Sequence, residues 1–344
     1  MYFYVGTYGN SIYLMDLSIE TGAVRTIGTT NGLIKPSYQA ISKDNKYLYT
    51  VNESGNGLGG VSVFEITGDL SLRLINSQPA KGPGPCHISV SECGKFLLAA
   101  GYADGSISVY PILKDRSLGE LCHIIYHEGK SVNTKRQNEP HAHCVKQLPG
   151  TDFVYVTDLG TDKINIYRLK DGLLLQNNPS YVKIHPGAGP RHLLFESENK
   201  YAYLINEVDN TVTVLRTDIN TGALTVLQDI STIPEQYEDI TWCSAIRISA
   251  DERFIYASNR GHDSITVFSR NRSSGLLTFN GFVPSKGNWP RDFNIDNQGK
   301  YLVVTNEHSD SLYTFTINSE TGLGEYTGYS ASIEKPACVT FLNI

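Results

Sequence analysis

A single unit is repeated seven times along this chain, and the repeat restricts the chain to very few folds. Each copy starts at an anchor residue and continues as alternating apolar and polar residues, a polar turn and a second alternating run. The anchors lie 46 to 57 residues apart: Pro36, Pro85, Ala142, Pro190, Cys243, Pro290 and Pro336. A repeat of this length, built from short strands, is typical of the blades of a β-propeller.

Each unit contains enough strand signals for a four-stranded blade. Residues 106–110 (SISVY) and 211–215 (TVTVL) alternate with period two, as half-buried third strands do. Polar turns rich in Gly, Asp and Asn, such as residues 91–95 and 296–300, separate the strands. We therefore predict an all-β propeller.

The two ends of the chain complement each other. Residues 336–341 read as a first strand with nothing after it, and residues 1–30 read as three strands with no first strand before them. If the C-terminal strand completes the N-terminal blade, the ring closes and no sheet edge stays open. The prediction is one seven-bladed domain covering residues 1–344, with the insertion at 128–139 lying as a loop over the rim.

Composition excludes several classes of function. A net charge of −6 without charge blocks argues against a general nucleic-acid or membrane surface. No apolar run approaches the ~20 residues of a membrane span, and the N-terminus lacks a basic leader. Six scattered cysteines suit buried thiols in a reducing compartment. We expect a soluble cytoplasmic protein, a monomer or weak dimer, with no nucleic-acid or membrane partner.

Function is expected where the repeats differ. In an antiparallel hairpin, the start of the first strand and the end of the second lie on the same side. One residue after the anchors stand Ser37, Cys86, His143, Arg191, Ser244, Arg291 and Ala337. Seventeen residues after them stand Glu53, Tyr102, Leu159, Glu207, Arg260 and Glu307. One face of the ring therefore collects a histidine, three arginines and three glutamates.

Four of these residues come from three adjacent repeats and do not recur: His143, Arg191, Glu207 and Arg260. Unpaired charges are costly to bury, so the converging charges either pair with one another or bind an anionic ligand. Both interpretations stay open. His87 and His192, two residues after their anchors, are expected to point into the blade packing, because strand alternation turns them away from their neighbours.

The chemistry of this set fits hydrolysis. A neutral histidine can take a proton from water, and arginines hold carboxylate or phosphate and stabilise an oxyanion. Together they suit a small, anionic, oxygen-rich ester or lactone. The sequence contains no nucleophile elbow, phosphate loop or dinucleotide fingerprint.

Two groups of residues could instead form a metal site. His141 and His143 lie on one face of a strand and could begin a zinc site, but a third ligand is missing. The repeated Asn-Glu pairs could surround Ca²⁺, but Arg191, Arg260 and Arg291 on the same face would repel a cation. We predict no metal and no other cofactor.

An ordered set of motifs resembles the seven-bladed propeller lactonases, represented by the bacterial cycloisomerase-type 6-phosphogluconolactonases and the fungal carboxy-muconate lactonizing enzymes. The motifs are VGTY at 5–8, YTVNE at 49–53, RQ at 136–137, HAH at 141–143, DLGTD at 158–162, GPRH at 189–192, NE at 206–207, SNR at 258–260 and PR at 290–291. The resemblance covers essentially the whole chain. Ala142 stands where many relatives are expected to have proline.

The resemblance implies a metal-independent site of one histidine, two arginines and a glutamate, which correspond here to His143, Arg191, Arg260 and Glu207. It implies hydrolysis of 6-phospho-D-glucono-1,5-lactone to 6-phosphogluconate, a step of the pentose phosphate pathway. In this hypothesis the arginines bind the anionic group and polarise the lactone carbonyl, His143 activates water, and Glu207 orients His143 or the sugar hydroxyls.

The remaining candidates for substrate contact are Arg291, His141, Glu53, Glu307 and Asp158. Glu53, Glu307 and Asp158 follow the repeat, so a purely structural role competes with substrate binding for them. Three other functions stay open: lactone formation by a muconate-type cycloisomerase, hydrolysis of another sugar lactone, and a non-catalytic propeller that binds a partner on this face.

Overall fold

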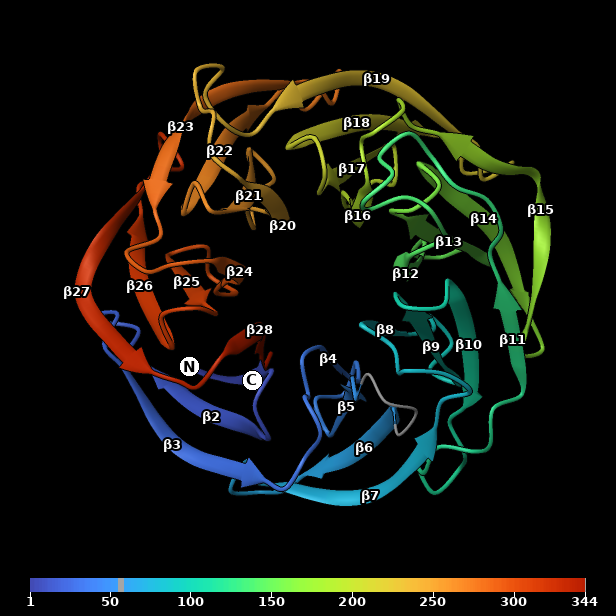
Figure 1. Cartoon of the computed structure of the whole chain (residues 1–344). Helices are drawn as coiled ribbons and strands as arrows, with labels where there is room; N and C mark the ends of the chain where they lie inside the picture. The colour runs from blue at the N-terminus through green and yellow to red at the C-terminus, as the bar shows by residue number, and fades with distance from the viewer. Residues whose placement is uncertain (55–58, 344) are drawn as a thin grey trace.

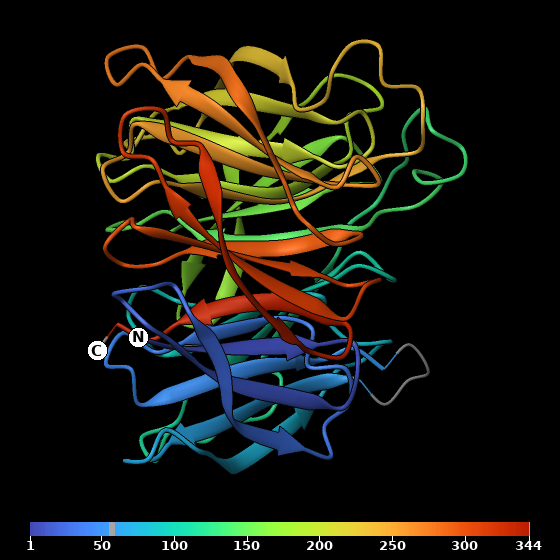
Figure 2. The ribbon, with the colours of Figure 1, turned by 90° about the vertical axis from the view of Figure 1, so that its left-hand side faces the viewer.

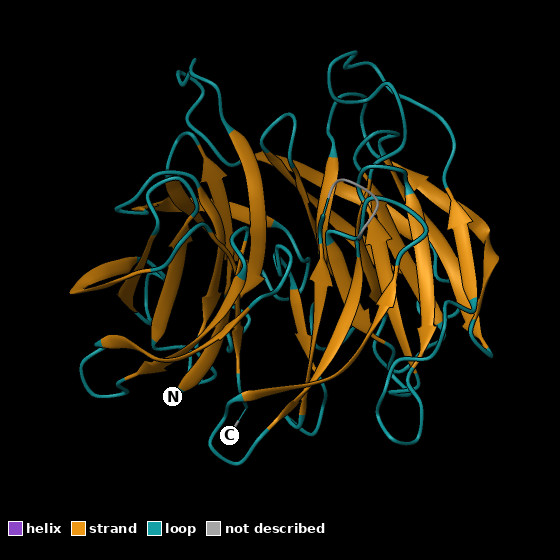
Figure 3. Ribbon diagram, turned by 60° about the horizontal axis from the view of Figure 1, so that its bottom comes forward, coloured by secondary structure: helices purple, strands orange, loops and turns teal. Residues whose placement is uncertain are grey.

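The chain forms a closed ring of seven four-stranded antiparallel sheets in a computed structural model that describes residues 1–54 and 59–343 (Figure 1). Every regular element in these residues is a strand, and no helix in them could cross a membrane (Figure 3). The predicted seven-bladed all-β propeller is therefore confirmed.

The blades follow the chain in order, each running from an inner to an outer strand. Blade 1 contains β28 (Pro336–Phe341), β1 (Tyr2–Thr7), β2 (Ser11–Leu17) and β3 (Val24–Asn31). Blade 2 contains β4 (Gln39–Ile41), β5 (Tyr47–Asn52), β6 (Gly60–Ile66) and β7 (Leu72–Pro79). Blade 3 contains β8 (His87–Val90), β9 (Phe96–Gly101), β10 (Ser106–Pro111) and β11 (His123–Tyr126). Blade 4 contains β12 (Ala142–Gln147), β13 (Phe153–Asp158), β14 (Lys163–Lys170) and β15 (Leu173–Lys183).

The last three blades have the same plan. Blade 5 contains β16 (Pro190–Phe195), β17 (Tyr201–Asn206), β18 (Thr211–Thr217) and β19 (Leu224–Ser231). Blade 6 contains β20 (Trp242–Ile248), β21 (Phe254–Arg260), β22 (Ser264–Arg270) and β23 (Leu277–Pro284). Blade 7 contains β24 (Pro290–Ile295), β25 (Tyr301–Asn306), β26 (Ser311–Ile317) and β27 (Gly324–Ser332).

The C-terminal strand closes the ring as predicted. Strand β28 pairs antiparallel with β1, with Phe3 opposite Phe341 and Val5 opposite Val339. Figure 1 shows both chain ends in this blade. Strand β28 thereby completes blade 1, which packs against blade 7 on one side and blade 2 on the other and closes the ring.

The hydrophobic core is divided among the contacts between neighbouring blades. Seven clusters of buried side chains each join two adjacent sheets; one packs Ile164 and Ile166 of blade 4 against Leu193 and Leu204 of blade 5. Each fully buried side chain of this size stabilises the fold by about 1.5–3 kcal/mol. The packed sheets hold the inner strands at fixed distances around the central channel.

Three tyrosines add a polar contact to these interfaces. Each donates its hydroxyl hydrogen to a glycine carbonyl in the outer hairpin of the next blade: Tyr155 to Gly222 at 2.8 Å, Tyr203 to Gly275 at 2.9 Å and Tyr256 to Gly322 at 2.8 Å. These glycines have φ between +70° and +74°, a conformation that favours glycine.

The insertion before blade 4 lies outside the sheets. Residues 127–141 connect β11 to β12 without a strand and project from one face of the ring (Figure 2). We call this face the upper face. The inner strands run from it to the lower face, where turns such as residues 196–200 lie.

Candidate active site

β-bulges aim the candidate residues into the channel. In blade 5, Pro190 pairs with Asn206 and His192 pairs with Ile205, so Arg191 is an extra residue in the inner strand. The same register shift occurs at His143 in blade 4 and at Arg291 in blade 7. A bulge redirects side chains next to sites, and here it occurs directly after the anchor residues.

Glu207 is the centre of the site. Its Oε2 accepts hydrogen bonds from Arg191 Nε and Arg260 Nη2, both at 2.8 Å, and its Oε1 accepts from Arg136 Nη2 at 2.5 Å. Arg191, Glu207 and Arg260 are 3–4% exposed. Three of the four predicted residues therefore lie in one buried ion-pair network, as the hairpin argument predicts.

The electrostatics keep Glu207 ionised. Burial by itself raises the pKa of the carboxyl group, but Arg260 and Arg191 outweigh it and hold this pKa well below its usual range. Burial lowers the pKa of Arg260 to about 10, and Glu207 opposes that effect. At neutral pH the network consists of a carboxylate and protonated arginines, so Glu207 has no proton to donate.

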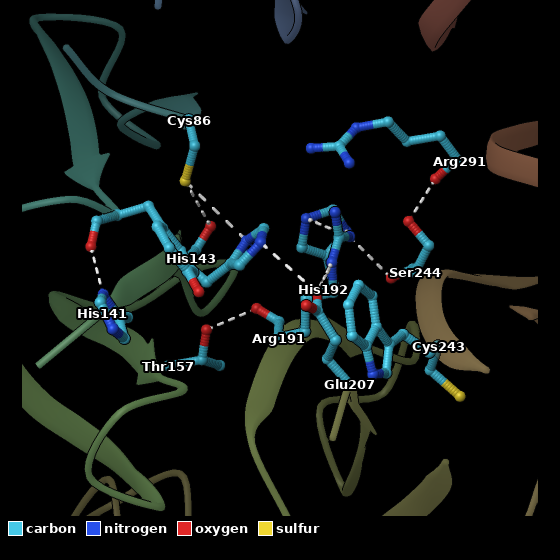
Figure 4. A network of polar contacts seen from close by, with 12 residues as sticks. Cys86, His141, His143, Thr157, Arg191, His192, Glu207, Cys243, Ser244 and Arg291 are labelled. Atoms are coloured by element: carbon cyan, nitrogen blue, oxygen red, sulfur yellow. Dashed lines mark hydrogen bonds and ion pairs between the residues drawn. The ribbon is translucent and has the colours of Figure 1, made fainter. Parts of the chain in front are cut away.

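His143 lies beside this network as a neutral imidazole. Its Nε2 is 3.9 Å from Glu207 Oε2, too far for a hydrogen bond, and its Nδ1 is 3.9 Å from Cys86 Sγ (Figure 4). Burial and then the charge of Arg191 lower its pKa well below 6.5. Within the described chain Nε2 makes no hydrogen bond, so it is free to accept a proton.

The expectation that Glu207 orients His143 does not match this geometry. The carboxylate is occupied by arginines, and its distance from the imidazole is 3.9 Å. Glu207 holds the guanidinium groups instead. Arg191 is fixed further because its Nη1 donates to the carbonyl of Ser244 at 2.7 Å, and Arg260 Nη2 donates to the carbonyl of Cys243 at 2.8 Å.

Arg136 is a member of the site that the repeat comparison did not select. It reaches Glu207 from the projecting loop, donates to the Tyr102 hydroxyl at 3.2 Å and stacks over Trp242, 4.7 Å from the ring centre. Its Nη1 is buried and has no hydrogen-bond partner in the described residues. The sequence held one signal, the RQ motif: Gln137 anchors the loop by donating to the Leu159 carbonyl at 2.8 Å.

Aromatic residues line the upper rim around these arginines. Trp242 and Trp289 meet edge to face, and Arg260 lies over both rings at 5.9 and 5.6 Å. His308 stacks on Trp289 with ring centres 4.6 Å apart. Such faces pack against sugar carbons while the arginines bind anionic groups.

Arg291 forms a second charged group on the opposite side of the channel. It lies over the Tyr8 ring at 4.5 Å, and its Nη1 is 3.5 Å from Glu307. Burial works against the charge of Arg291, but Tyr8 and Glu307 raise its pKa. Glu53 accepts a 2.5 Å hydrogen bond from Ser37. A space of about 10 Å³, roughly one water molecule, is lined by Tyr8, Arg291, His143 and Arg191.

His141 directly precedes β12, and Asp158 is the last residue of β13. His141 stacks on Tyr102, with ring centres 4.3 Å apart, and its Nδ1 contacts the Tyr102 carbonyl at 2.8 Å. Asp158 is fully buried and accepts hydrogen bonds from the backbone N–H groups of His141, Gly160 and Thr161 at 2.9–3.1 Å. Asp158 therefore holds the backbone that carries His141 and presents no exposed surface to a substrate.

The expectation that His87 and His192 point into the blade packing is wrong. The bulge at Arg191 cancels the strand alternation, so Arg191 Nη1 and His192 Nε2 are 3.1 Å apart. The ring of His192 lies edge-on to His143 at 5.3 Å and to His87 at 5.4 Å. Both histidines line the channel below His143.

The arrangement offers little to a metal ion. No group of three or more His, Cys, Asp or Glu side chains in residues 1–54 and 59–343 is placed to hold one. His141 is turned to the Tyr102 carbonyl and His143 to the channel, so the two imidazoles of the HAH motif do not converge.

Comparisons with known proteins agree with the fold and the motifs. The chain belongs to the lactonase family with a seven-bladed β-propeller, whose model matches residues 2–341. A 6-phosphogluconolactonase of Bacillus subtilis is 38% identical over 99% of this chain and 98% of its own length. A 6-phosphogluconolactonase of Formosa agariphila is 32% identical over 86% of this chain and 85% of its own length.

A solved structure shares the whole fold. The periplasmic gluconolactonase of Pseudomonas aeruginosa superposes with a TM-score of 0.94 at 28% identity, covering 100% of this chain and 99% of the other. The relatives therefore include enzymes named for a phosphorylated lactone and one named for an unphosphorylated lactone.

Proposed function

We propose that the chain hydrolyses 6-phospho-D-glucono-1,5-lactone to 6-phosphogluconate, a step of the pentose phosphate pathway, without a metal ion. The observation that carries the proposal is a neutral His143 with a free Nε2 next to arginines that Glu207 holds in place. The 38% identity to the Bacillus subtilis 6-phosphogluconolactonase over the full length supports the substrate.

The charge of the site suits an anionic substrate. Four arginines (136, 191, 260 and 291) face three glutamates (53, 207 and 307), which leaves one net positive charge. Arg136 has the unpaired Nη1 and lies at the rim. Arg136 and Arg260 bind the phosphate of the substrate, and the indoles of Trp242 and Trp289 contact the sugar.

In the chemical step His143 acts as the base. Its Nε2 takes a proton from water while the water oxygen attacks the lactone carbonyl carbon. The carbonyl oxygen becomes an oxyanion, which Arg191 and Arg291 stabilise from either side of the small space beside His143. When the intermediate collapses, the bond to the ring oxygen breaks and the imidazolium returns the proton to that oxygen, so the enzyme is regenerated.

Hydrolysis of the unphosphorylated glucono-1,5-lactone is the second candidate, because the Pseudomonas aeruginosa gluconolactonase shares the fold over the whole chain. The same base and oxyanion groups would act on both lactones. The two candidates differ in the use of Arg136, since only the phosphorylated lactone carries a phosphate for this guanidinium group at the rim. The ratio of kcat/KM for the two lactones decides between them.

The test is hydrolysis of freshly generated 6-phosphoglucono-lactone, with the spontaneous rate subtracted, with and without EDTA. We expect EDTA-resistant activity that falls at least a hundredfold in His143→Gln and in Arg191→Met. Both variants must keep the far-ultraviolet circular dichroism and melting profile of the parent. Activity that persists in folded His143→Gln would overturn the assignment of the base, and loss with EDTA would overturn metal independence.

The cysteines support a reducing compartment. All six are unpaired, and Cys93 and Cys122 are exposed. Exposed free thiols persist in a reducing compartment, which supports a cytoplasmic location. We also propose that the protein is a monomer or weak dimer and that it requires no nucleic acid or membrane. Size-exclusion chromatography with light scattering checks the oligomeric state.

A further inference from the structure

The central channel continues below the candidate active site into a second cavity. Below His143 and Arg191, the rings of Tyr38, His87 and His192 form a layer, with His87 4.3 Å from Tyr38 and 5.4 Å from His192. Under this layer lies a cavity of about 390 Å³ that reaches the lower ends of the inner strands. Its cationic residues are Lys146 of β12 and Arg247 of β20.

Lys146 is an unpaired cation in this cavity. It follows His143 by three residues on the same strand, so it lies ~10 Å further down the channel. Its side chain is half-buried, yet its ammonium group has no hydrogen bond or ion pair among the described residues. An unpaired charge in such a place is costly unless a counter-ion joins it.

Arg247, the other cation of the cavity, pairs with Asp292, so this carboxylate does not neutralise Lys146. Its Nη2 donates to Asp292 at 2.7 Å and its Nη1 to the Ile246 carbonyl at 2.9 Å, so one carboxylate already neutralises it. Arg247 also lowers the pKa of Lys146, after the larger effect of burial. Lys146 is therefore the cation of this cavity that has no carboxylate partner among the described residues.

A groove of about 520 Å³ between blades 2 and 3 adjoins the cavity. Tyr38, Gln39, His87 and Lys146 line both spaces. The inner part of the groove is apolar, with Tyr49 and Ile88 at its wall. At the outer rim of the groove Lys43 forms an ion pair with Glu92 at 3.0 Å. The cation without a partner is therefore Lys146, at the inner end of the groove.

We propose that the lower end of the channel is a second binding site, for a small organic anion whose phosphate or carboxylate lies between Lys146 and Arg247 and whose body extends into the groove. The ammonium and guanidinium groups bind the anionic oxygens. The site shares no residue with His143, Arg191, Glu207 or Arg260, so it does not depend on the proposed hydrolysis.

Binding titrations test the site. Inorganic phosphate, glucose 6-phosphate and gluconate are titrated calorimetrically into the wild type across the millimolar range at constant ionic strength. The same titrations use Lys146→Met, and Lys43→Met as a matched control at the rim. We expect at least one anion to bind at least tenfold more weakly to Lys146→Met, and unchanged to Lys43→Met.

The Arg260→Met variant distinguishes anion binding in the lower channel from anion binding at the candidate active site. We expect the lower-channel affinity to survive in Arg260→Met, and lactone hydrolysis without added anion to be unchanged in Lys146→Met. Affinity that is lost in Arg260→Met but kept in Lys146→Met overturns the proposal, as does binding of none of the three anions. Preference for glucose 6-phosphate or for gluconate identifies the head group.

A diffraction experiment locates the anion directly. Crystals soaked in selenate, which mimics phosphate, are measured at the selenium edge. We expect an anomalous peak within hydrogen-bond distance of Lys146 Nζ. Peaks confined to Arg136 and Arg260 on the upper face would overturn the assignment even if Lys146→Met fails to fold.

Discussion

Arg191 and Glu207 lie together at the open end of one β-hairpin, and Arg191 Nε donates a 2.8 Å hydrogen bond to Glu207 Oε2. The bond joins the start of β16 to the residue after β17 at the upper face. Because Arg260 shares the same oxygen atom, one carboxylate fixes guanidinium groups from two blades. The folded state therefore depends on the charge of Glu207 as well as on its shape.

The isosteric Glu207→Gln change tests this dependence. It leaves Arg191 and Arg260 buried without a counter-charge, so we expect it to lower the free energy of unfolding by ~3–5 kcal/mol. It also lets the arginines move, so hydrolysis should fall with it. Urea unfolding measures the first effect. Glu198→Gln removes an exposed partner of Lys200 and should leave the midpoint in place; equal midpoints for both variants would contradict the role of Glu207.

The buried histidines predict a loss of stability in acid. Burial holds the pKa values of His87, His143 and His192 well below 6.5. Below about pH 6.5 the unfolded imidazoles bind protons and the folded ones do not, so stability falls as the pH falls. Each contributes up to about 1.4 kcal/mol per pH unit. Burial lowers the pKa of His185, but Asp209 outweighs burial and raises it. His185 therefore adds stability as the pH falls, but it is one group against three.

Melting temperatures between about pH 8 and about pH 5 measure this effect. The wild type should melt progressively lower towards acid, and His192→Gln should show a shallower slope because one proton-binding group is removed. The same low pKa of His143 predicts that kcat/KM stays level until the pH is well below 6.5. A melting temperature that is constant down to about pH 5 would show that these imidazoles are protonated in the folded protein.

The contact between blades 5 and 6 predicts a smaller loss of stability. The Tyr203 hydroxyl donates to the Gly275 carbonyl at 2.9 Å and accepts from Arg270 Nε at 2.6 Å, in a fully buried position. Tyr203→Phe leaves both partners unsatisfied, so we expect a loss of about 1–3 kcal/mol in urea unfolding. Tyr329→Phe, at an exposed ring, serves as the control and should unfold like the wild type.

The fold was predictable because its information is repeated. Seven copies of one pattern reveal the period, and the incomplete copies at the two ends reveal that β28 joins β1. The hairpin geometry then places residues one and seventeen positions after an anchor on the same face, which brings Arg191 to Glu207. Both steps depend only on backbone pairing, which the alternating pattern encodes.

The errors and omissions arise where the backbone departs from the repeat. Strict alternation sends His192 into the packing, but the bulge at Arg191 adds one residue and turns His192 into the channel. No single sequence pattern identifies a bulge. Arg136 was missed because its loop occurs in one unit only and has no equivalent in the other copies for comparison.

Arg136 yields the sharpest prediction about substrate choice. It is held on Glu207 and Tyr102, its buried Nη1 has no hydrogen-bond partner in the described residues, and its loop is anchored by Gln137. A hydrogen bond to a charged group contributes ~1.5–3 kcal/mol, so Arg136→Ala should raise KM for the phosphorylated lactone roughly 10- to 100-fold. The effect on glucono-1,5-lactone should be small, because that substrate offers no phosphate.

Two further variants make this result specific. Arg136→Lys keeps the positive charge but loses the paired N–H donors of the planar guanidinium group, so we expect it to recover only part of the affinity. Lys135→Ala removes the neighbouring exposed cation from the same loop and should leave KM for both lactones unchanged. Steady-state kinetics on the two lactones provide the comparison. Equal increases in KM for both would mean that Arg136 shapes the pocket through Glu207 and does not bind the phosphate.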